Sequence, residues 1–169
     1  LSAGTMYYYW VKAYNASGSS GFSLAASNRT LPLPPAAPVI HSVAVVSTSQ
    51  LDITWQNLPT ETSYTLYFSS AKDTNTATNI SGFAADTTNY GDAGLAADTV
   101  YYYWVKAVNL GGISGFSAVA SNRTLPLPPA APVIHSVSAV SSSQLAVSWQ
   151  NLANETSYTL YFSSAKDTN

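Results

Sequence analysis

The most regular feature of the chain is an alternation of apolar and polar side chains. In residues 50–55 the apolar side chains occupy every second position and the run ends at Trp55, and residues 64–68 alternate in the same way. A period of two places the apolar side chains of a strand on one face, so these runs predict half-buried β-strands. No stretch of useful length has the 3.6-residue period of an amphipathic helix. The pattern therefore predicts an all-β fold.

The same alternation predicts the strands and the core residues of the middle of the chain. The predicted strands are 39–43, 50–55, 64–68, 76–80, 87–90, 101–108 and 115–123. The side chains expected to be buried between two antiparallel sheets are Trp55, Tyr64, Leu66, Tyr101, Tyr103 and Val105. A register error of one residue would reverse every one of these faces, so the burial of Trp55 tests the whole assignment.

A long internal repeat sets the domain organisation. Three segments return with identical sequence 94 positions later: 7–13, 27–43 and 61–75. This period is too long for a solenoid repeat and fits one β-sandwich domain. The repeat predicts three parts, which are the C-terminal part of one domain (1–31), a complete domain (36–125) and the N-terminal part of a third domain (130–169).

The strand motifs resemble those of fibronectin type III domains. The motifs are QLDITW at 50–55 for the B strand, YTLYF at 64–68 for the C strand, LAADTVY at 95–101 for the approach to a tyrosine corner, YWVKAVN at 103–109 for the F strand and GFS at 115–117 for the G strand. The resemblance implies tandem immunoglobulin-like β-sandwiches in a linear array. It says little about function, because sandwich folds serve many roles. The Arg-Gly-Asp tripeptide that some members use to bind integrins is absent.

Composition narrows the class of protein. The 169 residues include no cysteine, 46% are hydrophobic, 12% are aromatic, only 8% are charged, and the net charge is −2. Disordered chains lack aromatic residues, so disorder is not the explanation for the low charge. No basic patch is available for nucleic acid, and no apolar run is long enough to span a membrane. Because no signal peptide is present and the first residue is not Met, the chain is expected to be a mature or truncated segment. A β domain without cysteine, low in charge and rich in Ser and Thr, suits a secreted bacterial protein.

The segment 30–38, TLPLPPAAP, recurs unchanged as 124–132. Four prolines in nine residues favour a stiff, extended conformation. We interpret both copies as semi-rigid joints that pack against the domains they connect and give a fixed tilt. The alternative is a proline-rich ligand for a partner domain, but such ligands usually lie in disordered tails.

The aromatic side chains of the predicted F and C strands form a candidate interaction patch. Alternation places Tyr102 and Trp104 on the outer face of the sheet, beside Tyr67. The equivalent residues in the other copies are Tyr8, Trp10 and Tyr161. Two interpretations stay open: cross-strand packing that stiffens the sheet, and an exposed contact surface for a neighbouring chain or a glycan.

The polar residues predict neither a metal site nor catalysis. His41 and His135 occupy the same repeat position, and neither has a second His or a Cys nearby. Asp86, Asn89 and Asp92 are close in sequence but lack the ligand spacing of a calcium loop, so a turn is expected. We therefore expect no enzyme activity, no cofactor and no metal.

Repetition without a catalytic constellation favours a structural role. The first hypothesis is an extracellular or cell-surface structural and adhesive protein, a stalk or filament of tandem domains. The alternative is a spacer or carbohydrate-binding accessory array of a secreted polysaccharide-degrading enzyme.

The two partial domains predict partners among other copies of the same chain. Neither 1–31 nor 130–169 can bury its apolar face alone, and each exposes strand edges. The chain is expected to be a window from a longer array, or a unit in which the end of one copy completes the start of the next. Either case predicts that Tyr7, Tyr9 and Val11 meet the side of another copy that carries Trp149, Tyr158 and Leu160.

Overall fold

The structure, a computed structural model, describes residues 1–165. Every regular element in this range is a strand, which confirms the all-β prediction. The chain divides into two compact units, Leu1–Pro126 and the part from Leu127 on. The strands of the first unit are β1 (Met6–Tyr9), β2 (Tyr14–Asn15), β3 (Gly18–Ser19), β4 (Ala26–Arg29), β5 (Ile40–Val45), β6 (Gln50–Trp55), β7 (Ser63–Ser69), β8 (Thr78–Ala84), β9 (Asn89–Ala93), β10 (Val100–Asn109), β11 (Gly112–Ile113) and β12 (Ala120–Arg123). The second unit contains β13 (Ile134–Ser141) and β14 (Gln144–Trp149).

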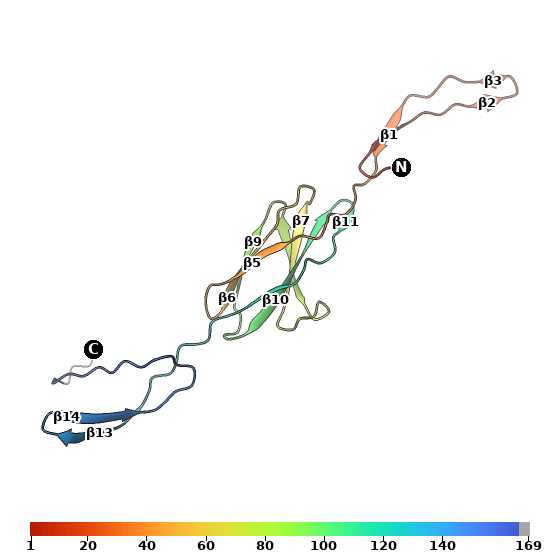
Figure 1. The fold of residues 1–169 in the computed structure, drawn as a ribbon. Coiled ribbons are helices and arrows are strands. Elements are labelled where there is room, and N and C mark those ends of the chain that lie inside the picture. The colour runs from red at the N-terminus through yellow and green to blue at the C-terminus, as the bar shows by residue number, and fades with distance from the viewer. Residues whose placement is uncertain (166–169) are drawn as a thin grey trace. The chain divides into compact units, whose positions relative to one another are not determined.

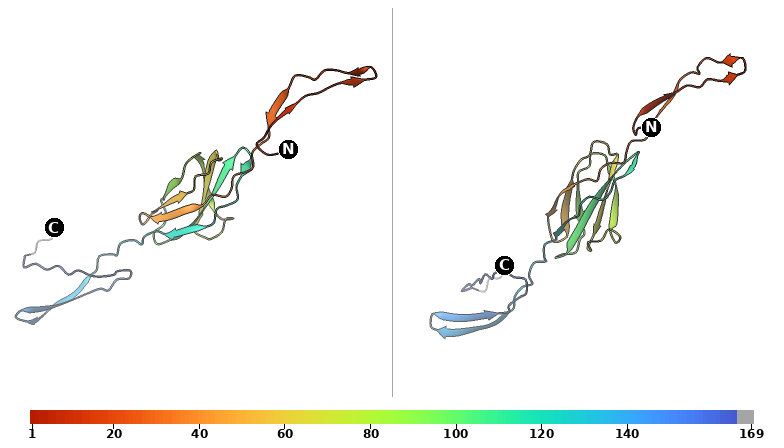
Figure 2. Two further views of the ribbon diagram at one scale, coloured as in Figure 1. Left: turned by 45° about the horizontal axis from the view of Figure 1, so that its top comes forward. Right: turned by 45° about the vertical axis from the view of Figure 1, so that its right-hand side comes forward.

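Residues 36–125, the middle domain, form two antiparallel sheets (Figure 1). One sheet has the order β5-β6-β9, and the other has the order β11-β10-β7-β8, with β12 also paired to β10. In both views of Figure 2 these strands gather into one body. The arrangement is the β-sandwich that the alternating runs predict.

The core confirms the predicted register. Along β6 every second side chain is buried, and the last of these is Trp55. The predicted core residues of β7 and β10 are buried as well: Tyr64, Leu66, Tyr103 and Val105. The remaining buried apolar side chains of this cluster are Leu51, Ile53, Leu58 and Ala107.

Tyr101 is half-buried at the edge of this core, and its hydroxyl accepts a hydrogen bond from the backbone N–H of Ala96 at 3.0 Å. This is the tyrosine corner that the approach to β10 predicts. Residues 1–31 repeat it, because the N–H of Ser2 donates to the Tyr7 hydroxyl at 2.7 Å.

The predicted strand 115–123 is wrong over its first half, and serine side chains are the reason. The N–H groups of Val105 and Ala107 donate to the hydroxyls of Ser117 and Ser114, at 3.0 and 2.9 Å, instead of to backbone carbonyls. The N–H groups of these two serines donate back to the carbonyls of Val105 and Ala107. The segment therefore runs beside β10. Serine hydroxyls replace the backbone carbonyls as acceptors in its first half, and regular backbone pairing begins only at β12.

The first proline-rich joint packs against the middle domain. Pro35 and Pro38 are buried, and the side-chain amide of Asn109 donates to the carbonyl of Leu33 at 3.0 Å. The Asn109 side-chain oxygen accepts from the N–H groups of Gly111 and Gly112, which fixes the turn between β10 and β11. The packing of this joint is as expected, whereas Pro129 and Pro132 of the second joint are exposed. The equal tilt of the two joints stays a prediction.

Substitution of Gly111 should disturb this joint. A Cβ atom at Gly111 would lie 2.0 Å from the carbonyl oxygen of Pro32, so the backbone of the joint must move. We expect Gly111→Ala to lower the free energy of unfolding by about 1–3 kcal/mol, the usual cost of overpacking, and to speed amide exchange in residues 30–38. Gly115→Ala is the matched control, because nothing lies within 4 Å of its Cβ position. Equal effects of the two substitutions would contradict the role of Gly111.

The second unit repeats the start of the middle domain locally. The rings of Trp149 and Tyr158 meet edge to face at 5.8 Å, as Trp55 and Tyr64 do at 6.0 Å. The N–H of Leu152 donates to the Tyr158 hydroxyl at 2.6 Å. Strands β13 and β14 pair as β5 and β6 do, but every residue of β13 is exposed.

Candidate interaction surface

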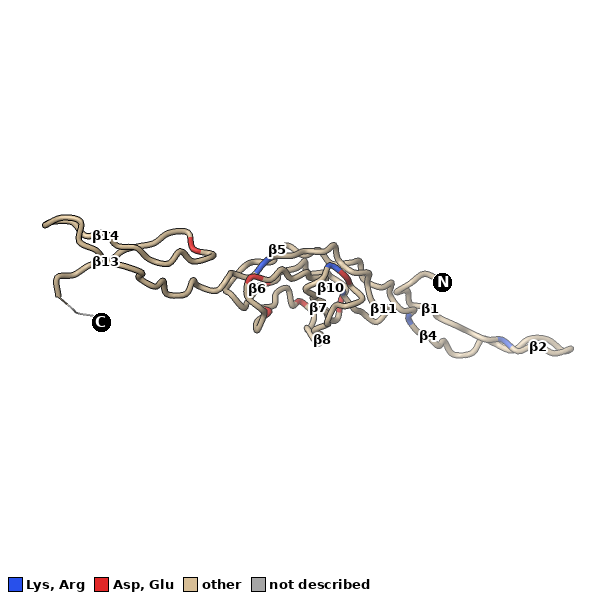
Figure 3. Tube along the Cα trace, turned by 90° about the horizontal axis from the view of Figure 1, so that it is seen from below, with Lys and Arg blue, Asp and Glu red and all other residues tan. Residues whose placement is uncertain are grey.

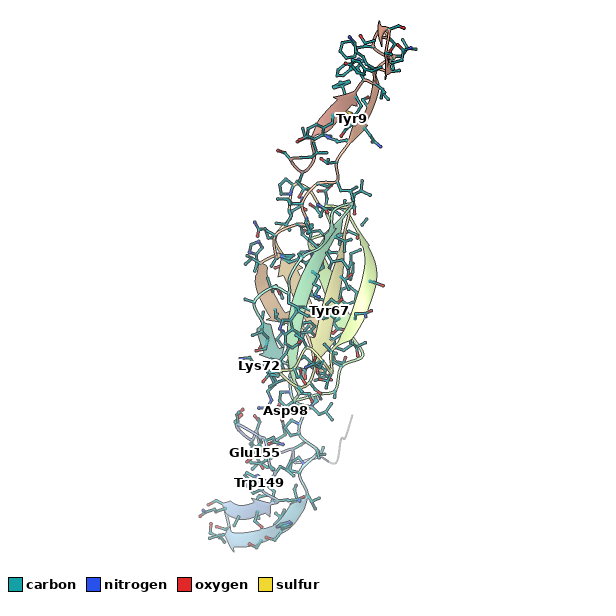
Figure 4. All side chains as sticks on the ribbon, turned by 90° about the vertical axis from the view of Figure 1, so that its right-hand side faces the viewer. Tyr9, Tyr67, Lys72, Asp98, Trp149 and Glu155 are labelled. Atoms are coloured by element: carbon teal, nitrogen blue, oxygen red, sulfur yellow. The ribbon has the colours of Figure 1, made fainter. Side chains whose placement is uncertain are left out.

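The predicted aromatic patch lies on the outer face of the sheet that contains β10. Trp104 on β10 is the register partner of Tyr67 on β7, and Figure 4 shows Tyr67 on this sheet. Tyr67 and Tyr102 are half-buried. Of the two interpretations, cross-strand packing fits Trp104, which is only 6% exposed.

Phe116, which the sequence patch did not include, explains this burial. Phe116 lies in the segment after β11, and its ring meets the ring of Tyr67 edge to face at 4.9 Å, although β10 lies between their segments. The Lys106 ammonium lies 3.8 Å from the centre of the Phe116 ring and 5.7 Å from that of Tyr67. These three side chains extend over β10 on the face of Trp104, and the pairing of a cation with two rings stabilises them.

A repeated signal could have identified this cluster. Lys106 and Phe116 recur as Lys12 and Phe22, and the Lys12 ammonium lies 4.5 Å from the Phe22 ring centre. The pair thus forms in both copies, even though only the middle domain supplies a neighbouring Tyr67. The sequence shows both residues, but not that the segment after β11 brings Phe116 back over β10.

The patch residues of the other copies are exposed. Tyr8 and Trp10 stack with ring centres 6.3 Å apart, and the Trp10 side chain is 54% exposed. Tyr161, in the second unit, is also exposed. In the middle domain the predicted patch therefore consists of the buried Trp104 and the half-buried Tyr67 and Tyr102, and its equivalents elsewhere are exposed. Its role in binding stays a prediction.

The three polar residues considered for calcium have separate structural roles. Asp86 has a positive φ of 63° in the turn between β8 and β9 and accepts from the Asn57 amide at 2.8 Å. Asn89 begins β9 and is exposed. Asp92 is buried and accepts a hydrogen bond from the Tyr103 hydroxyl at 2.8 Å, which links the two sheets. Asp86 lies in a turn as expected, whereas Asn89 and Asp92 belong to β9.

The Tyr103–Asp92 pair is the buried ionisable contact of the middle domain. Burial raises the pKa of the Asp92 carboxyl, and the hydrogen bond from Tyr103 partly offsets this. Burial also raises the pKa of the Tyr103 hydroxyl, and the nearby carboxylate raises it further. Tyr103 therefore stays protonated as the donor. The pair is enclosed in the sandwich, so it serves the fold.

Residues 1–165 contain no group of three or more His, Cys, Asp or Glu side chains that could hold a metal ion. His41 and His135 are both exposed. Figure 3 shows Lys, Arg, Asp and Glu scattered along the trace. One ion pair joins Arg123 to Asp98 at 3.0 Å, and both side chains are more than half exposed, so it adds little stability. The part of the chain that the structure describes has no helix that could cross a membrane.

We compared the chain with known proteins to find those of similar sequence. No protein-family model matches the chain. Over 95% of its length the chain is 28% identical to human contactin-1, and over 89% it is 27% identical to bovine contactin-1. It spans only 16% and 15% of the length of these relatives.

Solved structures give the same picture. The fold is similar to the crystal structure of the chicken CNTN1 FN1–FN3 domains, with a TM-score of 0.53 and 25% identity, over 74% of this chain and 44% of that one. The chain is also 32% identical to an Fn3-like protein from Clostridium thermocellum, with a TM-score of 0.47, and covers 97% of that protein and 56% of its own length. With the two-sheet sandwich and the tyrosine corner, the similarity to contactin-1 and to the CNTN1 FN1–FN3 domains shows that the chain belongs to the fibronectin type III domain family.

Proposed function

We propose that the chain serves in an extracellular or cell-surface structural and adhesive repeat protein, in which tandem fibronectin type III domains form a stalk or filament. The packed joint carries this proposal. Pro35 and Pro38 are buried, and Asn109 holds the carbonyl of Leu33, so the joint is tied to the domain that follows it. The sequence of this joint recurs at 124–132, where the equivalent prolines, Pro129 and Pro132, are exposed. The similarity to contactin-1 over 95% of the chain supports a place outside the cell.

The buried polar groups support a structural role over a catalytic one. Each of these side chains makes a hydrogen bond that holds the backbone or joins the sheets. They are Asp92, Asn109, Ser114, Ser117 and Thr124. Thr124, for example, donates to the carbonyl of Ala96 at 2.7 Å and accepts from the N–H of Thr99. Side chains committed in this way are not poised for proton transfer or nucleophilic attack.

Surface labelling of source cells tests this proposal. Antibodies raised against residues 36–125 should label intact, non-permeabilised cells, or detect the protein in the medium. Brief protease treatment of intact cells should remove the signal from the cells. A cytosolic protein of the same cells is the control for leakage. Labelling that requires permeabilisation would contradict an extracellular role.

The accessory-array alternative has one supporting observation, the exposed stack of Tyr8 and Trp10. Flat aromatic surfaces suit sugar rings, but the equivalent Trp104 of the middle domain is buried. Soluble oligosaccharides titrated into the chain and into Trp10→Ala distinguish the two functions. Saturable binding that Trp10→Ala abolishes would favour the alternative.

A further inference from the structure

The middle domain contains two sequences that can accept an N-linked glycan. One is Asn-Ile-Ser at 79–81, and the other is Asn-Arg-Thr at 122–124. Both fit the acceptor motif Asn-X-Ser/Thr. The motif alone carries little weight in a chain rich in Ser and Thr. The fold separates the two copies, because a bulky glycan needs an asparagine whose surroundings are open to solvent.

Asn79 lies on the outer face of an edge strand. Its strand β8 is the last in the order β11-β10-β7-β8. The next residue, Ile80, packs against the core, so the alternation along the strand turns Asn79 outward. The Asn79 side chain is exposed. A glycan on its amide nitrogen therefore extends away from the sandwich.

The hydroxyl residue of this motif lies in a β-bulge. The register of β8 shifts between Ile80 and Phe83, so that Ser81 and Gly82 lie opposite the single residue Thr65. Gly82 has a φ of 90°, which a glycine adopts without strain. Ser81 is exposed. Both polar residues of the motif are thus outside the core of the sandwich.

The second motif is used by the fold instead. The Asn122 amide donates to the carbonyl of Val43 at 2.8 Å, which joins β12 to β5, and the side chain is half-buried. The Thr124 side chain is only 2% exposed, and its hydroxyl donates to the carbonyl of Ala96 at 2.7 Å. A glycan on Asn122 would separate β12 from β5.

We propose that Asn79 carries an N-linked glycan and that Asn122 does not. The donor is an oligosaccharide linked to a lipid pyrophosphate. The Asn79 amide nitrogen forms a bond to the anomeric carbon of the first sugar and loses one proton. The bond from that carbon to the pyrophosphate oxygen breaks, and the lipid pyrophosphate leaves. The proposal rests on the proposed extracellular role, because this modification belongs to secreted and cell-surface proteins.

The glycan bears on the aromatic patch of the middle domain. Asn79 lies directly opposite Tyr67, which in turn lies opposite Trp104. The Cβ atoms of directly opposed residues are about 4.5–5.5 Å apart, so the first sugar is attached beside the Tyr67 ring. A glycan at this position occupies space that a protein partner would need on this side of Tyr67. The proposal therefore disfavours a protein contact here.

Peptide mapping of the protein from its source cells tests the proposal. The protein is isolated with the antibodies against residues 36–125 and treated with an N-glycosidase in heavy-oxygen water, which leaves a labelled aspartate at each glycosylated asparagine. We expect label at Asn79 and none at Asn122. An unlabelled Asn79 in protein that is found on the cell surface would overturn the proposal and leave the extracellular role standing. Label at Asn122 equal to that at Asn79 would also overturn it.

Asn79→Gln and Asn122→Gln are matched variants of the full chain. Each removes one motif and leaves those at Asn15, Asn28 and Asn154 in place. The variants are expressed in the secretory pathway of a host that attaches N-linked glycans, and the secreted protein is compared by gel mobility before and after glycosidase treatment. Asn79→Gln should carry one glycan fewer than the unchanged chain, and Asn122→Gln the same number. The reverse result, or no loss from Asn79→Gln, would refute the assignment.

Two substitutions at Ser81 show that the motif is responsible. Ser81→Ala keeps the asparagine but removes the hydroxyl, so it should lose the same glycan as Asn79→Gln. Ser81→Thr restores the motif and should keep the glycan. The unfolding transition of each variant shows that the middle domain stays folded, as expected for an exposed side chain. Retention of the glycan in Ser81→Ala would count against Asn79 as its site.

Discussion

Replacement of Trp55 by alanine should lower the free energy of unfolding of the middle domain by about 3–5 kcal/mol, the usual cost of removing a buried Trp. The Trp55 side chain is 1% exposed. Its ring meets Tyr64 edge to face at 6.0 Å and Phe83 at 5.6 Å, so its loss leaves a cavity between the sheets. The indole N–H has no hydrogen-bond partner, so packing alone is lost. Chemical denaturation followed by circular dichroism measures the change.

Trp10→Ala is the matched control for this prediction. It removes the same side chain from a position that is 54% exposed. Surface substitutions usually change stability by no more than about 0.5 kcal/mol, so the unfolding of the middle domain should be nearly unchanged. A cost below about 1 kcal/mol for Trp55→Ala would show that Trp55 does not anchor the core.

Tyr103→Phe should lower the free energy of unfolding by about 1.5–3 kcal/mol near neutral pH, the range for hydrogen bonds to charged groups. The Tyr103 hydroxyl donates to the Asp92 carboxylate at 2.8 Å, and both side chains are buried. Without the hydroxyl, a buried carboxylate loses its donor. Below the ordinary Asp pKa of about 3.9 the carboxyl of the folded protein is neutral, so the cost should fall. Urea denaturation of both proteins at pH 3.5 and pH 7 measures this difference.

The variant Asp92→Asn separates the charge from the hydrogen bond. Because burial raises the pKa of Asp92 in the folded state, the folded protein binds this proton more tightly than the unfolded chain does. The contribution of Asp92 to stability is therefore greatest below the unfolded pKa and is lost as pH rises through the folded pKa. The asparagine keeps an acceptor for Tyr103 without this loss. Asp92→Asn should accordingly gain stability relative to the unchanged chain as pH rises from about 4 to 7, and a constant difference across that range would contradict the argument.

The sequence alone determined the fold of the middle domain and the faces of its main strands. Alternation in 50–55 and 64–68 identified Trp55, Tyr64 and Leu66 as core residues, and the structure buries all three. This succeeds because a strand turns successive side chains to opposite faces, so one correct residue fixes the whole strand. The repeat likewise located the second copies of these strands without any structure.

The sequence did not show which side chains cover the outer face of the sheet. The alternation of side chains along the strand places Trp104 on the outer face of β10, but it does not show what lies over that face. Phe116 and Lys106 meet Tyr67 there only because the segment after β11 returns along β10 on serine-mediated hydrogen bonds. Asp92 is a similar case, because its partner Tyr103 belongs to the other sheet. Contacts between strands far apart in the chain leave no local pattern to read.

The clearest distinction comes from identical segments with different structures. Residues 64–69 form most of β7, whereas the same sequence at 158–163 forms no strand. Residues 104–107 lie in β10, whereas the same four residues at 10–13 do not. The sequence supplies the alternating pattern and the β propensity in all four places. A strand also needs neighbours to accept and donate its backbone hydrogen bonds and to cover its apolar face. Val11 and Ala13 exchange hydrogen bonds with Ser23 and Ser20 on one side. In the middle domain β10 also pairs with β7 on its other side.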